Sequence, residues 1–566
     1  MFSTLSDTPQ DFMRWTWTDI EPYFQDLAAR PLTASNVTAW LADWSRLNEL
    51  IDETYARLYV ATTQDTTDEA AEQRYHAFLE HIYPHAQTAD QELKQRLLAS
   101  GLKPNGFAIP LRNMRTEADL FRQENLPLLT QERKVTSELN RILGTQTVEW
   151  QGEERTLLQM EKVYTDPGRD VRERAWRMVS QRQLSDRDAV NELWGRYMDL
   201  RRQIAHNAGF DNYRDYRWRQ LLRFDYTPDD CRTFHQAIED VVVPAAARIY
   251  ERRRAQLGVD TLPPWDLDVD PTGQPALHPY DTDAELEQKG SAISRHVDPQ
   301  LGDYYDTMRR EGLLDLENRK GKGPGAYSTG FEVTKRPFIF MNAVGHNTEV
   351  RTLLHESGHA FHAFEAFKLP LYHQRFTPME FNEVASMAME LLAAPYLQAS
   401  DGGFYAPDDY RRARIQHLEK IVRFWPYMAV VDAFQHWVYE NHEAASNPEN
   451  CDARWADLWD RFMIGIDYGG LEPDKRNGWH RKRHIHRTPF YYIEYGLAQL
   501  GAVLVWRNAL HDQPQAVADY RRALALGGTV TLPVLYETAG VRFAFDAATL
   551  GEAIDLIENT LDALYE

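Results

Sequence analysis

Residues 355–359 read His-Glu-Ser-Gly-His, and this pentad has the residue types and spacing of a metal site. If the segment is helical, His355 and His359 project from one face about 6 Å apart, where both imidazoles can reach one ion. Glu356 projects from the same turn, so its carboxylate can hold a water at the ion without binding the ion itself. Chance would place such a pentad in roughly one chain in twenty of this composition. The alternative is an amphipathic helix with two surface histidines.

A second helix is predicted downstream of the pentad, over residues 377–394. Thr377 is suited to be its N-cap, Pro378 suits its first turn, and Glu380 would close a capping box. Pro395 would stop it. The distance along the chain allows the pentad helix to end, a loop to turn, and this second helix to return alongside the first.

Glu383 and Glu390 share one face of this predicted helix. An acidic side chain on a largely apolar face is costly to bury unless its charge is compensated, and a metal ion would compensate it. A catalytic zinc ion takes three protein ligands and keeps a fourth position open, so Glu383 is expected to join His355 and His359. Glu390 is expected to accept a hydrogen bond from a ligating histidine. The alternative is a pair of solvated surface carboxylates.

Gly358 lies inside the predicted pentad helix, where glycine costs about 0.5–1 kcal/mol relative to alanine. Its presence predicts the close approach of another backbone or of a substrate. His362, one turn beyond His359, is expected to be a structural histidine rather than a further ligand.

A third group of candidate residues overlaps and follows the basic run 479–487. Pro489 would open a helix on which Tyr491 and Tyr495 project one turn apart, just after His484. Phenol and imidazole donors near a zinc ion could stabilise an oxyanion, a contribution of about 2.7–4 kcal/mol for one donor. An aromatic core helix is the alternative interpretation of these tyrosines.

The pentad is preceded by one β-like region. Short runs bounded by Gly and Pro, at 325–331 and 336–342, predict a hairpin or small sheet. An edge strand beside the pentad helix could bind an extended peptide through backbone hydrogen bonds, which makes Gly325, Ala326 and Tyr327 candidate substrate-binding residues. A purely structural hairpin is the alternative.

The elements that must position these residues are predicted to be mostly α-helical. Apolar residues recur at helical spacing through most of the chain, as in the stripe Trp40, Trp44, Leu47 and Ile51. The pentad helix is expected at about 348–368. Such stripes are far more often core packing than a cofactor site, so they indicate a large helical core.

Two regions are expected: an N-terminal helical region over 1–110 and a catalytic region over 111–566. Residues 257–288 break the helical pattern with several Pro and Asp, which is typical of an ordered loop or a junction between lobes. The first region carries no candidate chemistry and is expected to form a helical wall.

Composition excludes several classes of function. The formal net charge of −22 argues against a nucleic-acid backbone as the main partner, because such binding rests on clustered Lys and Arg. The two cysteines, Cys231 and Cys451, are too few for a disulfide framework or a thiolate metal site, and they fit a reducing compartment. We expect no secretory signal, no bilayer-spanning segment and a cytoplasmic location.

With these motifs in place, the chain resembles the thimet oligopeptidase and oligoendopeptidase F family of zinc peptidases, in particular its bacterial oligoendopeptidase branch. The resemblance covers about residues 110–560. Its motifs are, in chain order, Gly209–Trp218, Gly325–Tyr327, His355–His362, Phe381–Ser386, Pro489–Tyr495 and Leu526–Gly528.

The resemblance implies a mostly α, two-lobed helical zinc-peptidase fold with a deep central channel and a small β-sheet beside the zinc helix. The channel would admit short peptides and exclude folded proteins. One Zn²⁺ per chain is implied, with His355, His359 and Glu383 as ligands and Glu356 as general base.

His484 and the nearby tyrosines match the family's transition-state donors. The branches of the family differ in spacing here, so His486 remains an alternative to His484. Tyr495 is preferred, then Tyr491, and Tyr492 remains open.

The implied function is zinc-dependent endopeptidase cleavage of short oligopeptides in peptide catabolism, with no nucleic-acid or membrane partner. A monomer and a homodimer are both compatible with the sequence. One alternative is a carboxypeptidase or dipeptidyl carboxypeptidase, in which Arg487 or Arg481 could bind a free C-terminal carboxylate. Another is a catalytically silent peptide-binding protein, against which the intact Glu356 and ligand set speak.

Overall fold

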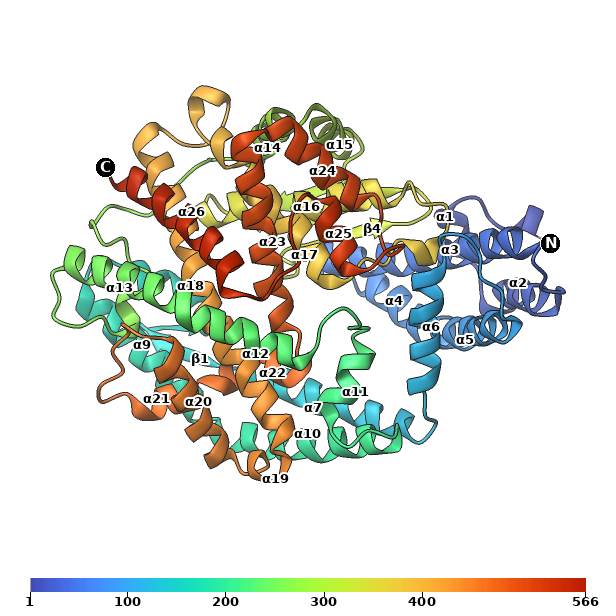
Figure 1. Cartoon of the computed structure of the whole chain (residues 1–566), viewed down its shortest axis with the longest axis horizontal. Coiled ribbons are helices and arrows are strands. Elements are labelled where there is room, and N and C mark those ends of the chain that lie inside the picture. Colours follow the sequence, from blue (N-terminus) through green and yellow to red (C-terminus); the bar gives the residue numbers. More distant parts are fainter. Residues whose placement is uncertain (1) are drawn as a thin grey trace. The chain divides into compact units, whose positions relative to one another are not determined.

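The computed structural model describes residues 2–566, which form two compact units. The first unit contains the chain up to Ala118, Leu277–Ala413 and Ala498–Phe543; the second contains Asp119–Ala276, Arg414–Leu497 and Ala544–Glu566. Most of the regular structure in both units is α-helical, which confirms the predicted fold class (Figure 1). The division into regions 1–110 and 111–566 remains a prediction.

Helices account for most of each unit. The first unit contains α1 (Pro9–Phe12), α2 (Trp17–Ala29), α3 (Val37–Gln64), α4 (Glu69–His81), α5 (Tyr83–Ser100), α14 (Asp283–Val297), α15 (Pro299–Arg310), α16 (Asn347–Ala366), α17 (Met379–Leu392), α24 (Gln513–Leu524) and α25 (Leu532–Thr538). The second contains α7 (Asn125–Gly144), α8 (Leu157–Met160), α9 (Arg169–Leu184), α10 (Arg187–Asn207), α11 (Tyr213–Gln220), α12 (Pro228–Ala237), α13 (Val243–Leu257), α19 (His442–Ala445), α20 (Pro448–Phe462), α21 (Glu472–Arg476), α22 (Arg483–Arg487) and α26 (Ala547–Tyr565). A unit boundary falls within α6 (Ala108–Leu120), α18 (Pro407–Glu440) and α23 (Tyr492–His511).

Two small sheets complete the fold. In the second unit, β1 (Thr147–Trp150) and β2 (Glu153–Thr156) form an antiparallel hairpin. In the first unit, β5 (Arg336–Ala343) is the central strand, with β3 (Leu314–Glu317) parallel to it and β4 (Tyr327–Phe331) antiparallel to it. The predicted hairpin is therefore confirmed, and β4 is an edge strand of its sheet.

Helix α3 carries the predicted apolar stripe into the core of the first unit. Trp40, Trp44 and Leu47 are at most 1% exposed and pack with residues of α2 and α5 in one hydrophobic cluster. Burial of large apolar side chains of this kind contributes about 1.5–3 kcal/mol each. The indole N–H of Trp40 donates to the carbonyl oxygen of Leu27 at 2.9 Å, so its polar atom is also satisfied.

Another face of α3 fixes the β4–β5 hairpin. The carboxylate of Glu53, which is fully buried, accepts hydrogen bonds from the backbone amides of Val333 and Thr334 in the turn, at 2.6 and 2.9 Å. Buried backbone donors are costly unless they are paired, and here a charged side chain pairs two of them. The hairpin is thus tied to the helical core of its unit.

Helices α16 and α17 lie side by side in the first unit (Figure 1). At Gly358 the backbones of the two helices come close together. A Cβ atom at this position would lie 2.5 Å from the carbonyl oxygen of Ala385 and 2.6 Å from the Cα of Ser386. Only glycine allows this approach, which confirms the predicted contact with another backbone. The same carbonyl of Ala385 accepts a hydrogen bond from the Tyr520 hydroxyl at 2.7 Å.

The start of α17 differs from the prediction. Its N-cap is Pro378, and no side chain among the described residues caps it. The expected capping box at Thr377 is wrong because the Thr377 hydroxyl has a tertiary partner instead, the Nε2 of His362 at 3.1 Å. Burial lowers the pKa of His362 to about 4, so this imidazole is neutral and structural, as expected.

Within the described residues, no helix combines the length and the apolar character needed to cross a membrane.

Candidate active site

Helices α16 and α17 bring the three predicted metal ligands together. The Nε2 atoms of His355 and His359 lie 3.4 and 3.8 Å from the Oε2 of Glu383. The ligand atoms of the three residues are all within 4.8 Å of one another. The sequence places these residues correctly because the i, i+4 spacing on α16 and the returning α17 together determine the geometry.

The orientation of His355 is set from behind by Glu390. The Nδ1 atom of His355 lies 2.9 Å from the Oε1 of Glu390, which leaves Nε2 directed at Glu383. Burial alone would lower the pKa of His355, but the hydrogen bond and the charges of these carboxylates raise it to about 9. Glu390 therefore lies where it could orient a ligating His355.

The electrostatics of the group fit a bound cation. Burial raises the pKa of Glu383, although Ser386 donates a hydrogen bond to its Oε2 at 3.0 Å. Burial lowers the pKa of His359 well below its usual value, so its ring is in the neutral form that binds metals. Two imidazoles and one carboxylate are a donor set of catalytic zinc sites, and a divalent ion would offset the crowded carboxylate charge. These residues fit Zn²⁺.

Glu356 lies on α16 directly after His355 and is 7% exposed. Burial, together with the charges of Glu383 and Glu390, raises the pKa of its carboxyl group to about 7. The carboxylate also accepts a hydrogen bond from the backbone of Ser328 on β4. The candidate base and the edge strand are thereby in direct contact.

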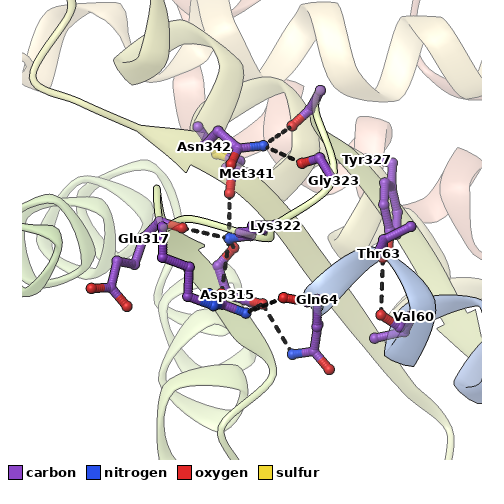
Figure 2. A network of polar contacts seen from close by, with 12 residues as sticks. Val60, Thr63, Gln64, Asp315, Glu317, Lys322, Gly323, Tyr327, Met341 and Asn342 are labelled. Carbon is purple, nitrogen blue, oxygen red and sulfur yellow. Dashed lines mark hydrogen bonds and ion pairs between the residues drawn. The ribbon is translucent and has the colours of Figure 1, made fainter. Parts of the chain in front are cut away.

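The loop that leads into β4 is anchored by a lysine that the sequence analysis did not single out. Lys322 has no exposed side-chain surface, and its Nζ donates to the backbone carbonyls of Asp315, Glu317 and Met341 at 2.9, 2.7 and 2.5 Å (Figure 2). It also donates to the Asp315 carboxylate at 2.9 Å. A buried ammonium with four acceptors on several elements holds this loop against the sheet.

Asn342 fixes the same loop from β5. Its Nδ2 donates to the carbonyl oxygens of Gly323 and Gly325, at 2.8 and 3.0 Å (Figure 2). In the sequence, Lys322 stands out only as a basic residue in a glycine-rich stretch. Its partners lie on separate strands, and a sequence pattern does not reveal them.

The three candidate substrate-binding residues differ in their surroundings. Gly325 and Ala326 are exposed. The Tyr327 ring instead stacks on Phe340 with centroids 4.9 Å apart, and its hydroxyl lies 2.6 Å from the Oγ1 of Thr63 (Figure 2). Its side chain therefore packs the sheet on α3, and only its backbone is suited to pair with a peptide.

The third predicted group lies in the second unit. The ring of His484, on α22, is 5.9 Å from that of Tyr491 and 6.2 Å from that of Tyr495, and all three side chains are partly exposed. Burial, with the charges of Lys482 and Arg487, lowers the pKa of His484 to about 4. Its neutral ring can still donate one N–H, as a phenol can donate one O–H.

The two alternatives, Tyr492 and His486, are in the core of the second unit. Tyr492 is 6% exposed, and its hydroxyl lies 2.7 Å from the Nζ of Lys482. His486 is fully buried and stacks on Trp479, with ring centroids 5.6 Å apart. The exposure of His484, Tyr491 and Tyr495 makes them the better candidates for contact with a substrate.

A strained backbone precedes these tyrosines. Phe490 has a φ of 66°, which side-chain-bearing residues rarely adopt. Its amide donates to the Oε1 of Gln435 at 2.8 Å, and its carbonyl accepts from the Nη2 of Arg223 at 2.5 Å. Such strain persists only where neighbours fix it, and it is common next to functional residues. Neither Arg223 nor Gln435 had a sequence signal that linked it to this site.

Comparison with known proteins identifies the family. The sequence model of Peptidase family M3 matches residues 163–553, more than half of the chain, and that of the Peptidase M3 N-terminal domain matches residues 8–105. The chain belongs to peptidase family M3. This M3 assignment confirms the resemblance inferred from the motifs at the level of the family.

Curated M3 relatives match in part of their length. Oligopeptidase PepF of Bacillus subtilis is 27% identical over 276 residues, which cover 47% of this chain and 39% of the relative. An oligoendopeptidase F homolog of Mycoplasma pneumoniae is 30% identical over 298 residues, 48% of this chain and 46% of the relative. The chain thus spans less than half the length of these curated relatives.

Similarity of structure extends further than these alignments. The solved structure of PZ peptidase A with an inhibitor has 27% sequence identity and a TM-score of 0.86. The match covers 100% of this chain and 99% of that chain. The helical fold is therefore shared with that peptidase over the whole described chain.

Proposed function

We propose that this M3 family member is a zinc-dependent endopeptidase that hydrolyses short oligopeptides. The observation that carries the proposal is the convergence of His355, His359 and Glu383 within 4.8 Å, with Glu356 one residue from the first ligand. A set of three ligands beside a buried carboxylate is the arrangement that metal-assisted hydrolysis of an amide needs.

In this proposal the chain supplies the ligands, the base and their orientation. His355, His359 and Glu383 would hold the ion, and Glu390 would keep the His355 ring in its ligating orientation. When bound, zinc supplies a Lewis acid and an activated water. Glu356 would take a proton from the attacking water and deliver it to the leaving amine.

His484, Tyr491 and Tyr495 are proposed as donors to the developing oxyanion. The proposal rests on the family resemblance and on their partial exposure within the second unit. Each offers a neutral hydrogen-bond donor, and a preorganised donor of this kind stabilises a tetrahedral intermediate by about 2.7–4 kcal/mol.

Substrate binding is proposed to use β4, the edge strand of its sheet, and the exposed Gly325 and Ala326. An extended peptide can pair with such an edge through its backbone, which is independent of its side chains. Short peptides as substrates, the implied channel and the cytoplasmic location remain part of the proposal.

The test is cleavage of defined peptides by the zinc-loaded protein. Peptides of graded length, each with a free or an amidated C-terminus, are incubated with the protein, and the products are identified by mass spectrometry. We expect internal cleavage that is indifferent to amidation and is abolished by a chelator. Cleavage confined to free C-termini would instead identify a carboxypeptidase or dipeptidyl carboxypeptidase. No cleavage by protein that retains zinc would favour a silent peptide-binding protein.

A further inference from the structure

A second set of metal-ligand side chains is buried in the second unit. Cys231 and His235 lie four residues apart on α12, and Asp432 and His436 lie four residues apart on α18. Each pair therefore shares one helix face. Contacts between the two pairs show that these faces meet.

The distances are those of a compact coordination group. The ligand atoms of Cys231, Asp432 and His436 all lie within 4.8 Å of one another. The Nε2 of His436 is 3.3 Å from the Oδ2 of Asp432. Neighbouring ligand atoms around a tetrahedral zinc ion are roughly 3.3–3.8 Å apart, given bond lengths of 2.0–2.3 Å. The His436–Asp432 distance already falls in this range.

The polar atoms of this group are buried, and burial of a polar atom costs free energy unless the atom has a partner. Cys231 and Asp432 are 0% exposed and His436 is 3% exposed. Among the described residues, the Oδ1 of Asp432 and the Nδ1 of His436 have no hydrogen-bond partner, and the Nε2 of His436 contacts the Oδ2 of Asp432 at 3.3 Å. Buried polar atoms without partners are rare in folded proteins, and each one needs an explanation.

A purely internal ion pair explains less of the geometry. The Nε2 of His235 lies 2.9 Å from the Oδ2 of Asp432, and the two imidazoles hold the pKa of this carboxyl group, against its burial, far below its usual value. That pairing accounts for the carboxylate charge. It leaves the Oδ1 of Asp432 and the Nδ1 of His436 without hydrogen bonds among the described residues. A metal ion would account for all three side chains.

We propose that Cys231, Asp432 and His436 form a second metal site, which takes a divalent cation of borderline softness such as Zn²⁺. A thiolate, a carboxylate and an imidazole together favour zinc over hard cations such as Mg²⁺ or Ca²⁺. His235 is a positioning residue, because its hydrogen bond orients the ligating carboxylate. The ion joins α12 to α18, which suits a structural role.

Cys231 and Cys451 differ in their surroundings. Two cysteines are too few for a site built of thiolates, but one thiolate suffices in a mixed ligand set. Cys451 provides a matched control, since it is equally buried and its Sγ donates to the carbonyl oxygen of Ala445 at 3.2 Å.

The first test is the zinc content of the purified full chain. Wild type is expected to bind about two ions, Cys231→Ser about one, and Cys451→Ser about two. His359→Ala, which removes a ligand of the α16 group, should also bind about one, and the double variant C231S/H359A none. Equal zinc content in wild type and Cys231→Ser would overturn the proposal, whereas a failure of peptide cleavage would leave it untouched.

Cobalt gives a readout that depends on the thiolate. Co²⁺-loaded wild type should show a sulfur-to-cobalt charge-transfer band in the near ultraviolet, because one ligand is a thiolate. The band should persist in Cys451→Ser and His359→Ala and disappear in Cys231→Ser. His235→Gln should keep the band while Co²⁺ binds this site about 10–100-fold more weakly. Absence of the band in wild type contradicts the proposal even if a variant fails to fold.

Discussion

The Nδ1 of His355 and the Oε1 of Glu390 lie 2.9 Å apart, a contact that joins α16 to α17 behind the metal ligands. Because the second nitrogen of a ligating histidine is usually held in this way, replacement of Glu390 should loosen the ligand without removing it. We predict that Glu390→Gln weakens zinc affinity about 10–100-fold, measured by competition with a chromophoric chelator. An unchanged affinity would show that His355 needs no such support.

Replacement of Glu356 tests its proposed role as general base. Glu356→Gln keeps the size of the side chain and the ligands, so the zinc content should equal that of wild type. Peptide cleavage should fall by about 10²–10⁴-fold, the range that general acid–base catalysis contributes. Zinc analysis and kinetics on the same preparation check both parts. Substantial residual turnover would remove Glu356 from the role of base.

The tyrosines allow a matched comparison within one helix. Tyr495→Phe is predicted to lower kcat more than it raises KM, since a donor to the transition state should be lost, with kcat falling by roughly 10²–10³-fold. Tyr492→Phe is the control, because the Tyr492 hydroxyl contacts Lys482 in the core. An unchanged kcat in Tyr495→Phe, or an equal loss in both variants, would contradict the assignment.

Gly358 tests the contact between α16 and α17. Gly358→Ala would place a Cβ 2.5 Å from the carbonyl oxygen of Ala385, and we predict a loss of stability of about 1–3 kcal/mol. Gly195→Ala, within α10, is the control. Apart from its chain neighbours and the backbone of its own helix, no described atom lies within 4 Å of the added Cβ. That variant should gain about 0.4–1 kcal/mol. Thermal unfolding of both variants would distinguish a steric clash from a general effect of alanine.

We predict that ionisation of Asp52, on α3, makes the stability of the folded protein depend on pH. Burial, followed by the charge of Glu332, raises the pKa of this carboxyl group to about 7. The folded-state pKa lies above the unfolded value, so the stabilisation by the protonated form is complete below about pH 4 and is lost as pH rises through about 7. Asp52→Asn should therefore unfold at a higher temperature than wild type at pH 8, and the difference should shrink at pH 5. A difference that grows toward pH 5 would contradict the assignment.

The convergence of the three proposed metal ligands could be predicted from the sequence because their geometry is local. His355 and His359 need only a helix, and Glu383 needs only that a second helix returns beside the first. The choice between His484 and His486 is different. Both follow the same basic run, and only the packing of His486 on Trp479 shows that its ring is in the core.

The errors and omissions also have physical causes. The capping box at Thr377 fails because a tertiary partner, His362, takes the hydroxyl. The group that contains Cys231 and Asp432 could not be predicted because its members lie on helices far apart in the chain. An i, i+4 pair on each helix is common, and only the folded structure shows that the two faces meet.

The backbone contact at Gly358 also bears on how the metal centre is assembled. With α16 seated directly on the Ala385–Ser386 backbone, the histidines and Glu383 are carried by one rigid pair of helices rather than by segments that an ion must gather. Metal binding then requires little ordering of the chain, so little of the binding free energy is used to fold it. We expect the apoprotein to remain folded and to bind and release zinc reversibly. One preparation could then be stripped of metal and reloaded with other divalent ions.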